Sequence, residues 1–161
     1  MKQKSLQITH IMIKAFYIIL ALVTIVPPFV YKGKIIEGDT ITIYYFTLLA
    51  AVPAGAVALV SLDRLMINLR KKIVFHTDNV KRLRTLSWCC FFASLVTLVS
   101  FIIELLSFSL DDMGIMVFGI VFYLPMFIIG VGEIFVGLVV RVVMHTFENA
   151  IEIKDENDLT I

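Results

Sequence analysis

Four long apolar stretches dominate the chain, and the charged residues gather between them. The stretches cover residues 11–31, 41–62, 86–108 and 113–140, approximately. A bilayer core about 30 Å thick needs roughly 20 apolar residues of helix. None of the four stretches shows the polar face that a soluble helix repeats every 3.6 residues. Because lipid offers no hydrogen bonds to the backbone, such runs must be helical. The pattern therefore predicts an all-α integral membrane protein, a four-helix bundle.

The polar segments complete a single membrane domain over residues 1–161, with a loop at 63–85 and a tail at 141–161. The second span should extend into the loop as an amphipathic helix, because four apolar residues repeat there at helical spacing: Leu62, Leu65, Met66 and Leu69. We expect a break near Phe75 and His76, with Thr77 or Asp78 as the N-cap of the helix that leads into the third span. The tail should continue the helix of the fourth span.

Lysine and arginine are distributed unequally between the two sides of the predicted bundle. Two of them, Lys32 and Lys34, follow the first span. The other twelve lie on the side of the termini: Lys2, Lys4, Lys14, Arg64, Arg70, Lys71, Lys72, Lys81, Arg82, Arg84, Arg141 and Lys154. Cytoplasmic segments carry the excess of basic residues. The distribution predicts a multi-pass protein of the cytoplasmic membrane with both termini in the cytoplasm.

Composition and motifs argue against most soluble functions. The chain is 60% hydrophobic and 17% charged, with a formal charge of +1, so direct binding of nucleic acid is not expected. The two cysteines, Cys89 and Cys90, are adjacent and cannot easily bridge each other. We find no nucleophile–base set, glycine-rich phosphate loop or CxxC motif, and the three histidines lack paired metal-ligand spacing. We therefore expect no enzymatic activity, cofactor or metal.

Two ionisable residues fall at similar depth inside predicted spans. Lys14 enters the first span, and Glu133 lies seven residues before Val140 in the fourth. Charged groups in a span are costly and need a partner or a function. A Lys14–Glu133 ion pair is one interpretation, and a ligand or proton site at Glu133 is the other. Gly130 and Gly137 share the face of Glu133, so a neighbouring helix should pack closely there.

The third span carries small and polar residues at steps of four and three, ending in a carboxylate. The candidate polar face comprises Thr97, Ser100, Glu104 and Ser107. Such a face should point into the bundle. It serves either to pack helices together or to line an outward-opening cavity.

The basic loop and the acidic tail lie on the same side of the predicted membrane. The loop either only fixes topology at the anionic membrane surface, or forms with the tail a cytoplasmic cap or a face for a partner. The residues predicted for that cap or face are Leu69, Arg70, Lys71, Lys72, Thr77, Asn79, Val80, Leu83, Arg84, Asp158, Leu159, Thr160 and Ile161.

Two segments resemble a known family. Within VFHTDNVKRLRTLSW, six residues match a Pro-Phe-Thr-x-x-Asn-Val-x-x-Leu-Arg element: Phe75, Thr77, Asn79, Val80, Leu83 and Arg84. Val74 stands where proline is usual. The ending Glu156–Ile161 is similar to that family's terminal signature. The family is the group of bacterial membrane proteins catalogued as domain of unknown function 2975. The resemblance implies no catalytic residues. It does imply a regulatory pairing, because members of the family are often encoded beside a small helix-turn-helix regulator.

Two functional hypotheses follow. In the first, the protein is a membrane-bound modulator that engages a helix-turn-helix transcription regulator through its cytoplasmic loop and tail. In the second, it is a small transport or self-protection protein, similar to bacteriocin immunity proteins, that uses the polar face of the third span. Gene neighbourhood distinguishes the two, and a homo-oligomer is compatible with either.

Overall fold

The chain forms four long α-helices in the computed structural model. The structure describes residues 2–30, 40–71, 73–107 and 113–158. The helices are α1 (Lys2–Val30), α2 (Thr40–Arg70), α3 (Thr77–Ser107) and α4 (Met113–Asp158). All four are long and apolar enough to cross a membrane. The sequence prediction of an all-α protein with four spans is thus confirmed in the described ranges.

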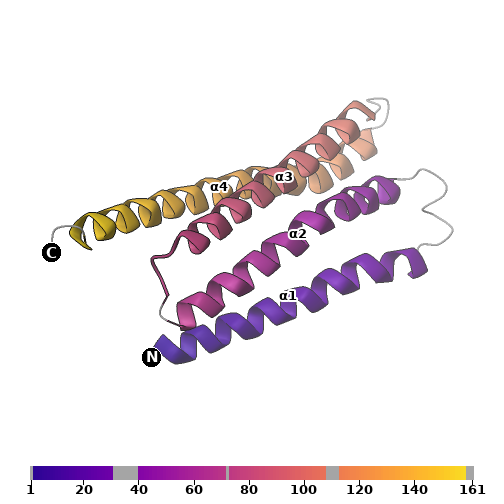
Figure 1. Cartoon of the computed structure of the whole chain (residues 1–161). Helices are drawn as coiled ribbons and strands as arrows, with labels where there is room; N and C mark the ends of the chain where they lie inside the picture. The colour runs from indigo at the N-terminus through magenta and orange to yellow at the C-terminus, as the bar shows by residue number, and fades with distance from the viewer. Residues whose placement is uncertain (1, 31–39, 72, 108–112, 159–161) are drawn as a thin grey trace.

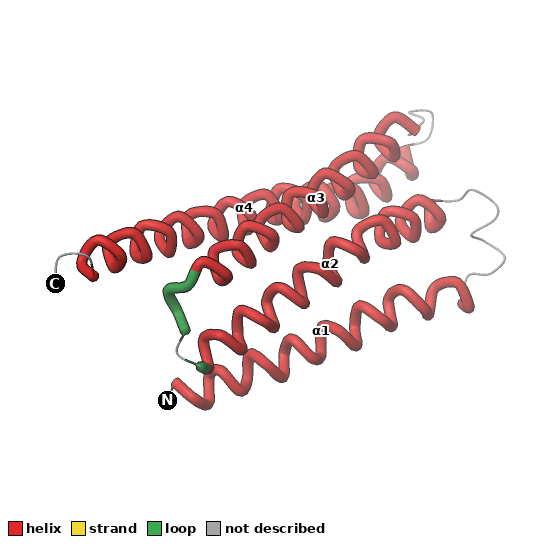
Figure 2. Tube along the Cα trace, in the orientation of Figure 1, coloured by secondary structure: helices red, strands yellow, loops and turns green. Residues whose placement is uncertain are grey.

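The helices run alternately up and down, and each packs on its neighbour in the chain. The extensive interfaces in the described part of the chain are α1–α2, α2–α3 and α3–α4. Both termini and the α2–α3 connection lie at one end of the molecule, at the left of Figure 1. Figure 2 shows that this connection is short, so α2 and α3 are held side by side.

Helix α4 is longer than one crossing of a membrane requires. Helix α4 has 46 residues, which corresponds to a length of about 69 Å at about 1.5 Å per residue. This is roughly twice the thickness of a hydrocarbon core. Its C-terminal part continues beyond the length that one crossing requires. It does so beside the start of α3, at the end that carries both termini (Figure 1).

The outward faces of the helices consist mainly of large apolar side chains. Phe29 is 78% exposed, Leu106 80% and Phe135 67%. Contiguous apolar surface of this extent is rare on soluble proteins. Lipid chains solvate it without cost, because the side chains and the lipid are equally apolar. The surface is that of an integral membrane protein.

Glycine and serine allow α3 and α4 to approach closely. A Cβ atom on Gly130 would lie 2.8 Å from Leu98 Cδ2, and one on Gly137 would lie 3.0 Å from Phe91 Cε1. Two buried hydroxyls cross the same interface. Ser94 Oγ donates to the carbonyl of Gly130 at 2.8 Å, and Ser87 Oγ donates to that of Gly137 at 3.0 Å. The close packing predicted at the two glycines is confirmed, with α3 as the neighbour.

Candidate functional site: the loop–tail layer

Buried Asn79 organises the connection between α2 and α3. Its side chain is 0% exposed. Asn79 Nδ2 donates to the carbonyls of Ile73 and Val74, both at 2.8 Å, and Asn79 Oδ1 accepts from Asn68 Nδ2 at 2.7 Å. One side chain thus satisfies two carbonyls of the connection and ties it to the last turns of α2. We call this end of the molecule, residues 63–85 and 141–158, the loop–tail layer.

The N-terminus of α3 is capped by a histidine. Helix α3 begins at Thr77, and His76 Nδ1 accepts a hydrogen bond from the backbone N–H of Asp78 at 3.2 Å. The imidazole nitrogen takes the place of the side-chain oxygen that usually caps a helix. The predicted break is confirmed, whereas the cap is His76, which lies one residue before Thr77 and two before Asp78, the two predicted caps. An imidazole nitrogen that carries no hydrogen can accept a hydrogen bond in this way.

An apolar cluster joins the start of α3 to the extended part of α4. Val80, Leu83 and Met144 are buried, and Met144 is only 2% exposed. Four partly buried residues pack against the three: Leu65, Val140, Phe147 and Ile151. The ring of Phe147 also lies 5.5 Å, centroid to centroid, from that of Phe75 in the connection. The cluster draws on α2, the connection, α3 and α4, so the loop–tail layer is a packed unit.

Charged groups connect α3 and α4 at the edge of this cluster. Arg84 Nη2 lies 2.9 Å from Glu148 Oε1, and His145 Nδ1 lies 2.9 Å from Glu148 Oε2. The guanidinium of Arg141 lies 5.6 Å from the centroid of Trp88, within the range of a cation–π contact. The contacts of Arg84 and Arg141 join α3 to α4, whereas His145 and Glu148 both belong to α4. Arg84 and His145 are more than half exposed, so their contacts with Glu148 add little stability.

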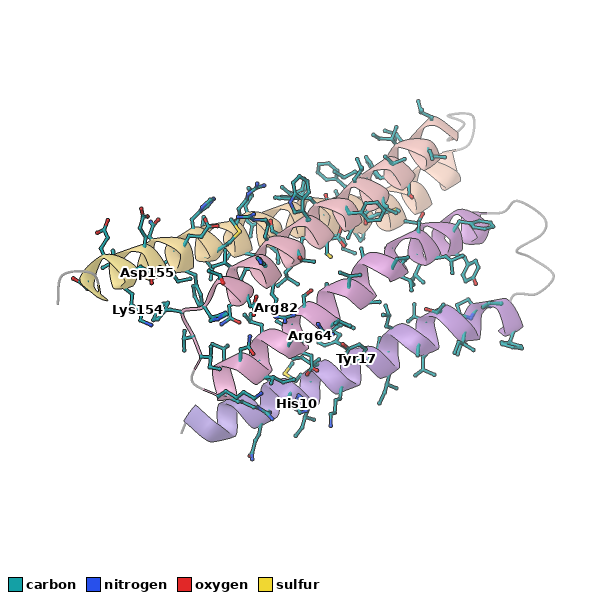
Figure 3. The ribbon with its side chains drawn as sticks, in the orientation of Figure 1. His10, Tyr17, Arg64, Arg82, Lys154 and Asp155 are labelled. Atoms are coloured by element: carbon teal, nitrogen blue, oxygen red, sulfur yellow. The ribbon has the colours of Figure 1, made fainter. Side chains whose placement is uncertain are left out.

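A groove of about 570 Å³ lies between the first turns of α3 and the end of α4. Helix α3 contributes basic and apolar side chains, and α4 contributes mostly acidic ones. Figure 3 shows Lys154 and Asp155 on this last part of α4. The lining residues are Thr77, Val80, Lys81, Arg84, Glu148, Ile151, Glu152, Asp155 and Glu156.

The residues predicted for a cap or partner face separate into two groups. Asn79, Val80 and Leu83 are buried and belong to the internal packing of the layer. Exposed or half-exposed residues remain on its surface: Leu69, Arg70, Lys71, Thr77 and Arg84. Lys72 and the final residues Leu159, Thr160 and Ile161 lie outside the described residues, as does the side chain of Asp158. The described part of the tail is helical and packs on α3 through Ile151.

The structure does not bring Lys14 and Glu133 together. Lys14 is exposed on α1, which packs on α2. Glu133 faces α3, where Thr97 Oγ1 lies 3.2 Å from its Oε2. In the described part of the chain, α1 shares no extensive interface with α4. The ion pair was inferred from equal depth alone, and equal depth does not make two helices neighbours.

The predicted polar face of α3 is divided between two neighbouring helices. Thr97 faces Glu133 on α4, whereas Ser100 accepts a hydrogen bond from Thr47 on α2. The side chains of Glu104 and Ser107 lie outside the described residues. Thr97 and Ser100 therefore join helices at two separate interfaces and do not line one common cavity.

Three contacts were not predicted from the sequence. Ser87 and Ser94 bond the carbonyls of Gly137 and Gly130. Both pairs are separated by seven residues along their helices, and this matched spacing is the signal that could have revealed the contact. At the loop–tail end, His10 Nδ1 of α1 lies 3.2 Å from Asp63 Oδ1 of α2, outside hydrogen-bond geometry. No sequence signal indicated this pair.

Comparison with family models gives one match. The model described as "Protein of unknown function (DUF2975)" matches residues 11–161. The chain belongs to the DUF2975 family. No curated protein and no solved structure matched the chain. The resemblance seen in the loop and at the C-terminus is thereby confirmed, and the DUF2975 match includes the complete loop–tail layer.

Proposed function

We propose that this DUF2975 protein is a non-enzymatic membrane anchor that docks a small helix-turn-helix transcription regulator. Docking takes place on the cytoplasmic side of a bacterial membrane, at the groove of the loop–tail layer. By holding the regulator at the membrane, the protein controls how much of it reaches DNA.

The distribution of basic residues supports the cytoplasmic orientation. Twelve of the fourteen lysines and arginines lie on the side of the termini and the α2–α3 connection. The positive-inside rule places such a side in the cytoplasm. Both termini and the connection also lie at one end of the structure (Figure 1), so one orientation is consistent for all three segments.

The groove between α3 and α4 is the observation that carries the proposal. Its side chains include the apolar Val80 and Ile151, and the carboxylates of Glu152, Asp155 and Glu156 come from α4. An amphipathic helix binds by placing its apolar face in such a groove. A DNA-reading helix also carries lysine and arginine for phosphate contacts. The acidic side of the groove complements that charge, so docking would cover the surface that the regulator uses to bind DNA.

Co-purification with a candidate helix-turn-helix regulator tests the proposal. The full-length protein is solubilised from membranes in mild detergent, and the amount of bound regulator is measured over a range of salt. Glu152→Gln removes a groove carboxylate. Asn149→Lys makes the same +1 change of charge at an exposed residue of α4 that does not line the groove.

We expect Glu152→Gln to weaken regulator binding about fivefold, which corresponds to about 1 kcal/mol. Asn149→Lys should have little effect. Operator DNA should displace the regulator from the wild-type protein, because both would bind the same basic surface. Failure of the wild-type protein to retain the regulator, or equal weakening by both variants, would rule out docking at the groove.

A further inference from the structure

Among the described residues, Glu133 has one hydrogen-bond partner and no countercharge. The half-buried carboxyl group meets Thr97 Oγ1 at 3.2 Å. Four contacts between a basic side chain and a carboxylate are found among the described residues, and none of them includes Glu133. Among the described side chains of α3, Cys90 is close enough to Glu133 to interact with it electrostatically, and Cys89 is its neighbour in the chain. Neither thiol supplies a positive charge.

The hydroxyl hydrogen of Thr97 already has an acceptor. Thr97 Oγ1 lies 3.0 Å from the carbonyl of Ala93, one turn earlier in α3. Threonine in a helix commonly donates to that carbonyl. Ser87 and Ser94 on the same side of α3 also donate to carbonyls, those of Gly137 and Gly130. The hydroxyls of this interface therefore supply their hydrogens to backbone oxygens.

Counting hydrogens determines the form of Glu133 that fits. A carbonyl and an ionised carboxylate are both acceptors only, and a hydroxyl has a single hydrogen. With an ionised Glu133, the contacts to Ala93 and to Glu133 would have to share the one hydroxyl hydrogen of Thr97. With the carboxylic acid, Glu133 donates to Thr97 Oγ1 and Thr97 donates to Ala93, so each contact has one. An unpaired charge within a span is also unfavourable.

We propose that Glu133 is a proton-binding site inside the membrane, which holds its proton at neutral pH and donates it in a hydrogen bond to Thr97. The bound ligand is the proton itself. Such an acid is a target for a lipophilic carbodiimide. The acid proton moves to a carbodiimide nitrogen while the carboxyl oxygen bonds to the central carbon, so the adduct carries the whole mass of the reagent.

Labelling with dicyclohexylcarbodiimide tests the protonation. The full-length protein in lipid vesicles is treated at a series of pH values, and labelled peptides are quantified by mass spectrometry. We expect labelling of Glu133 at pH 7 that declines as pH rises, and none at this position in Glu133→Gln. Lys14→Met should leave labelling unchanged, because Lys14 does not contact Glu133. Absence of labelling at pH 7 in the folded protein would overturn the proposal.

Variants of Thr97 test the direction of the hydrogen bond. If Thr97 accepts from the acid, Thr97→Val removes the hydrogen-bond acceptor that stabilises the protonated form of Glu133. The pH of half-maximal labelling should then fall by about one unit, a tenfold change in proton affinity, and Thr97→Ser should restore it. If that pH rises in Thr97→Val, the hydroxyl donates to a carboxylate and the proposal is wrong.

Infrared spectroscopy provides a readout that does not depend on the reagent or on the Thr97 variants. The wild-type protein at pH 7 should show a carboxylic acid C=O band that is missing from Glu133→Gln. Identical spectra of the two proteins in that region would contradict a protonated Glu133.

Discussion

Replacement of Asn79 should destabilise the loop–tail layer more than any nearby polar substitution. Asn79→Ala removes three hydrogen bonds of 2.7–2.8 Å from a fully buried side chain. A typical hydrogen bond contributes about 1 kcal/mol net. Water can reach part of the connection, since Ile73 is exposed, so the released carbonyls are partly solvated. We expect a loss of about 2–3 kcal/mol in the free energy of unfolding.

Asn68→Ala is the matched control, because it removes only the bond to Asn79 Oδ1. It should cost about 1 kcal/mol. Unfolding in mixed micelles can be followed by the fluorescence of Trp88, the single tryptophan of the chain, which contacts Arg141 across the α3–α4 interface. Equal losses for the two variants, or a loss below about 0.5 kcal/mol for Asn79→Ala, would show that Asn79 does not organise the connection.

Two further predictions concern the α3–α4 interface. Gly137→Ala should be less stable than Gly132→Ala by about 1–3 kcal/mol. A Cβ on Gly137 meets Phe91 at 3.0 Å, whereas one on Gly132 has nothing within 4 Å. Equal stabilities of the two variants would contradict the close approach of the helices. A double-mutant cycle on Arg84 and Glu148 should give a coupling of about 0.2–1 kcal/mol that disappears at high salt, because the Arg84 side chain is 57% exposed. A larger coupling that is insensitive to salt would show that the pair is not solvated.

The fold was predictable because the bilayer restricts the chain so strongly. Each apolar run of sufficient length can only be a helix, and the amphipathic repeat ending at Leu69 correctly predicted that α2 continues to Arg70. The exact cap of α3 was not predictable. Thr77, Asp78 and His76 can all accept a hydrogen bond at a helix start, and the direction of the incoming chain decides which of them does so.

The packing partners of polar residues were predicted less well than their depth. Residue counts gave Lys14 and Glu133 similar depths, but they do not reveal which helices are neighbours. On α3, three residues amount to about 300° of helix, which leaves Thr97 and Ser100 about 60° apart around the axis. That difference is enough for Thr97 to face α4 while Ser100 faces α2. Sequence spacing alone does not show where on the surface of α3 the contact with α4 ends and the contact with α2 begins.

The membrane orientation of the loop–tail layer can be measured directly by cysteine accessibility. In a background with Cys89 and Cys90 replaced by serine, single cysteines are placed at Lys81 and Asp155 in the groove and at Gly38 between the first two spans. Intact cells are treated with a membrane-impermeant maleimide. The docking account predicts labelling at position 38 only, with positions 81 and 155 labelled once the cells are opened. Labelling of positions 81 and 155 in intact cells would place the groove outside the cell and contradict the account.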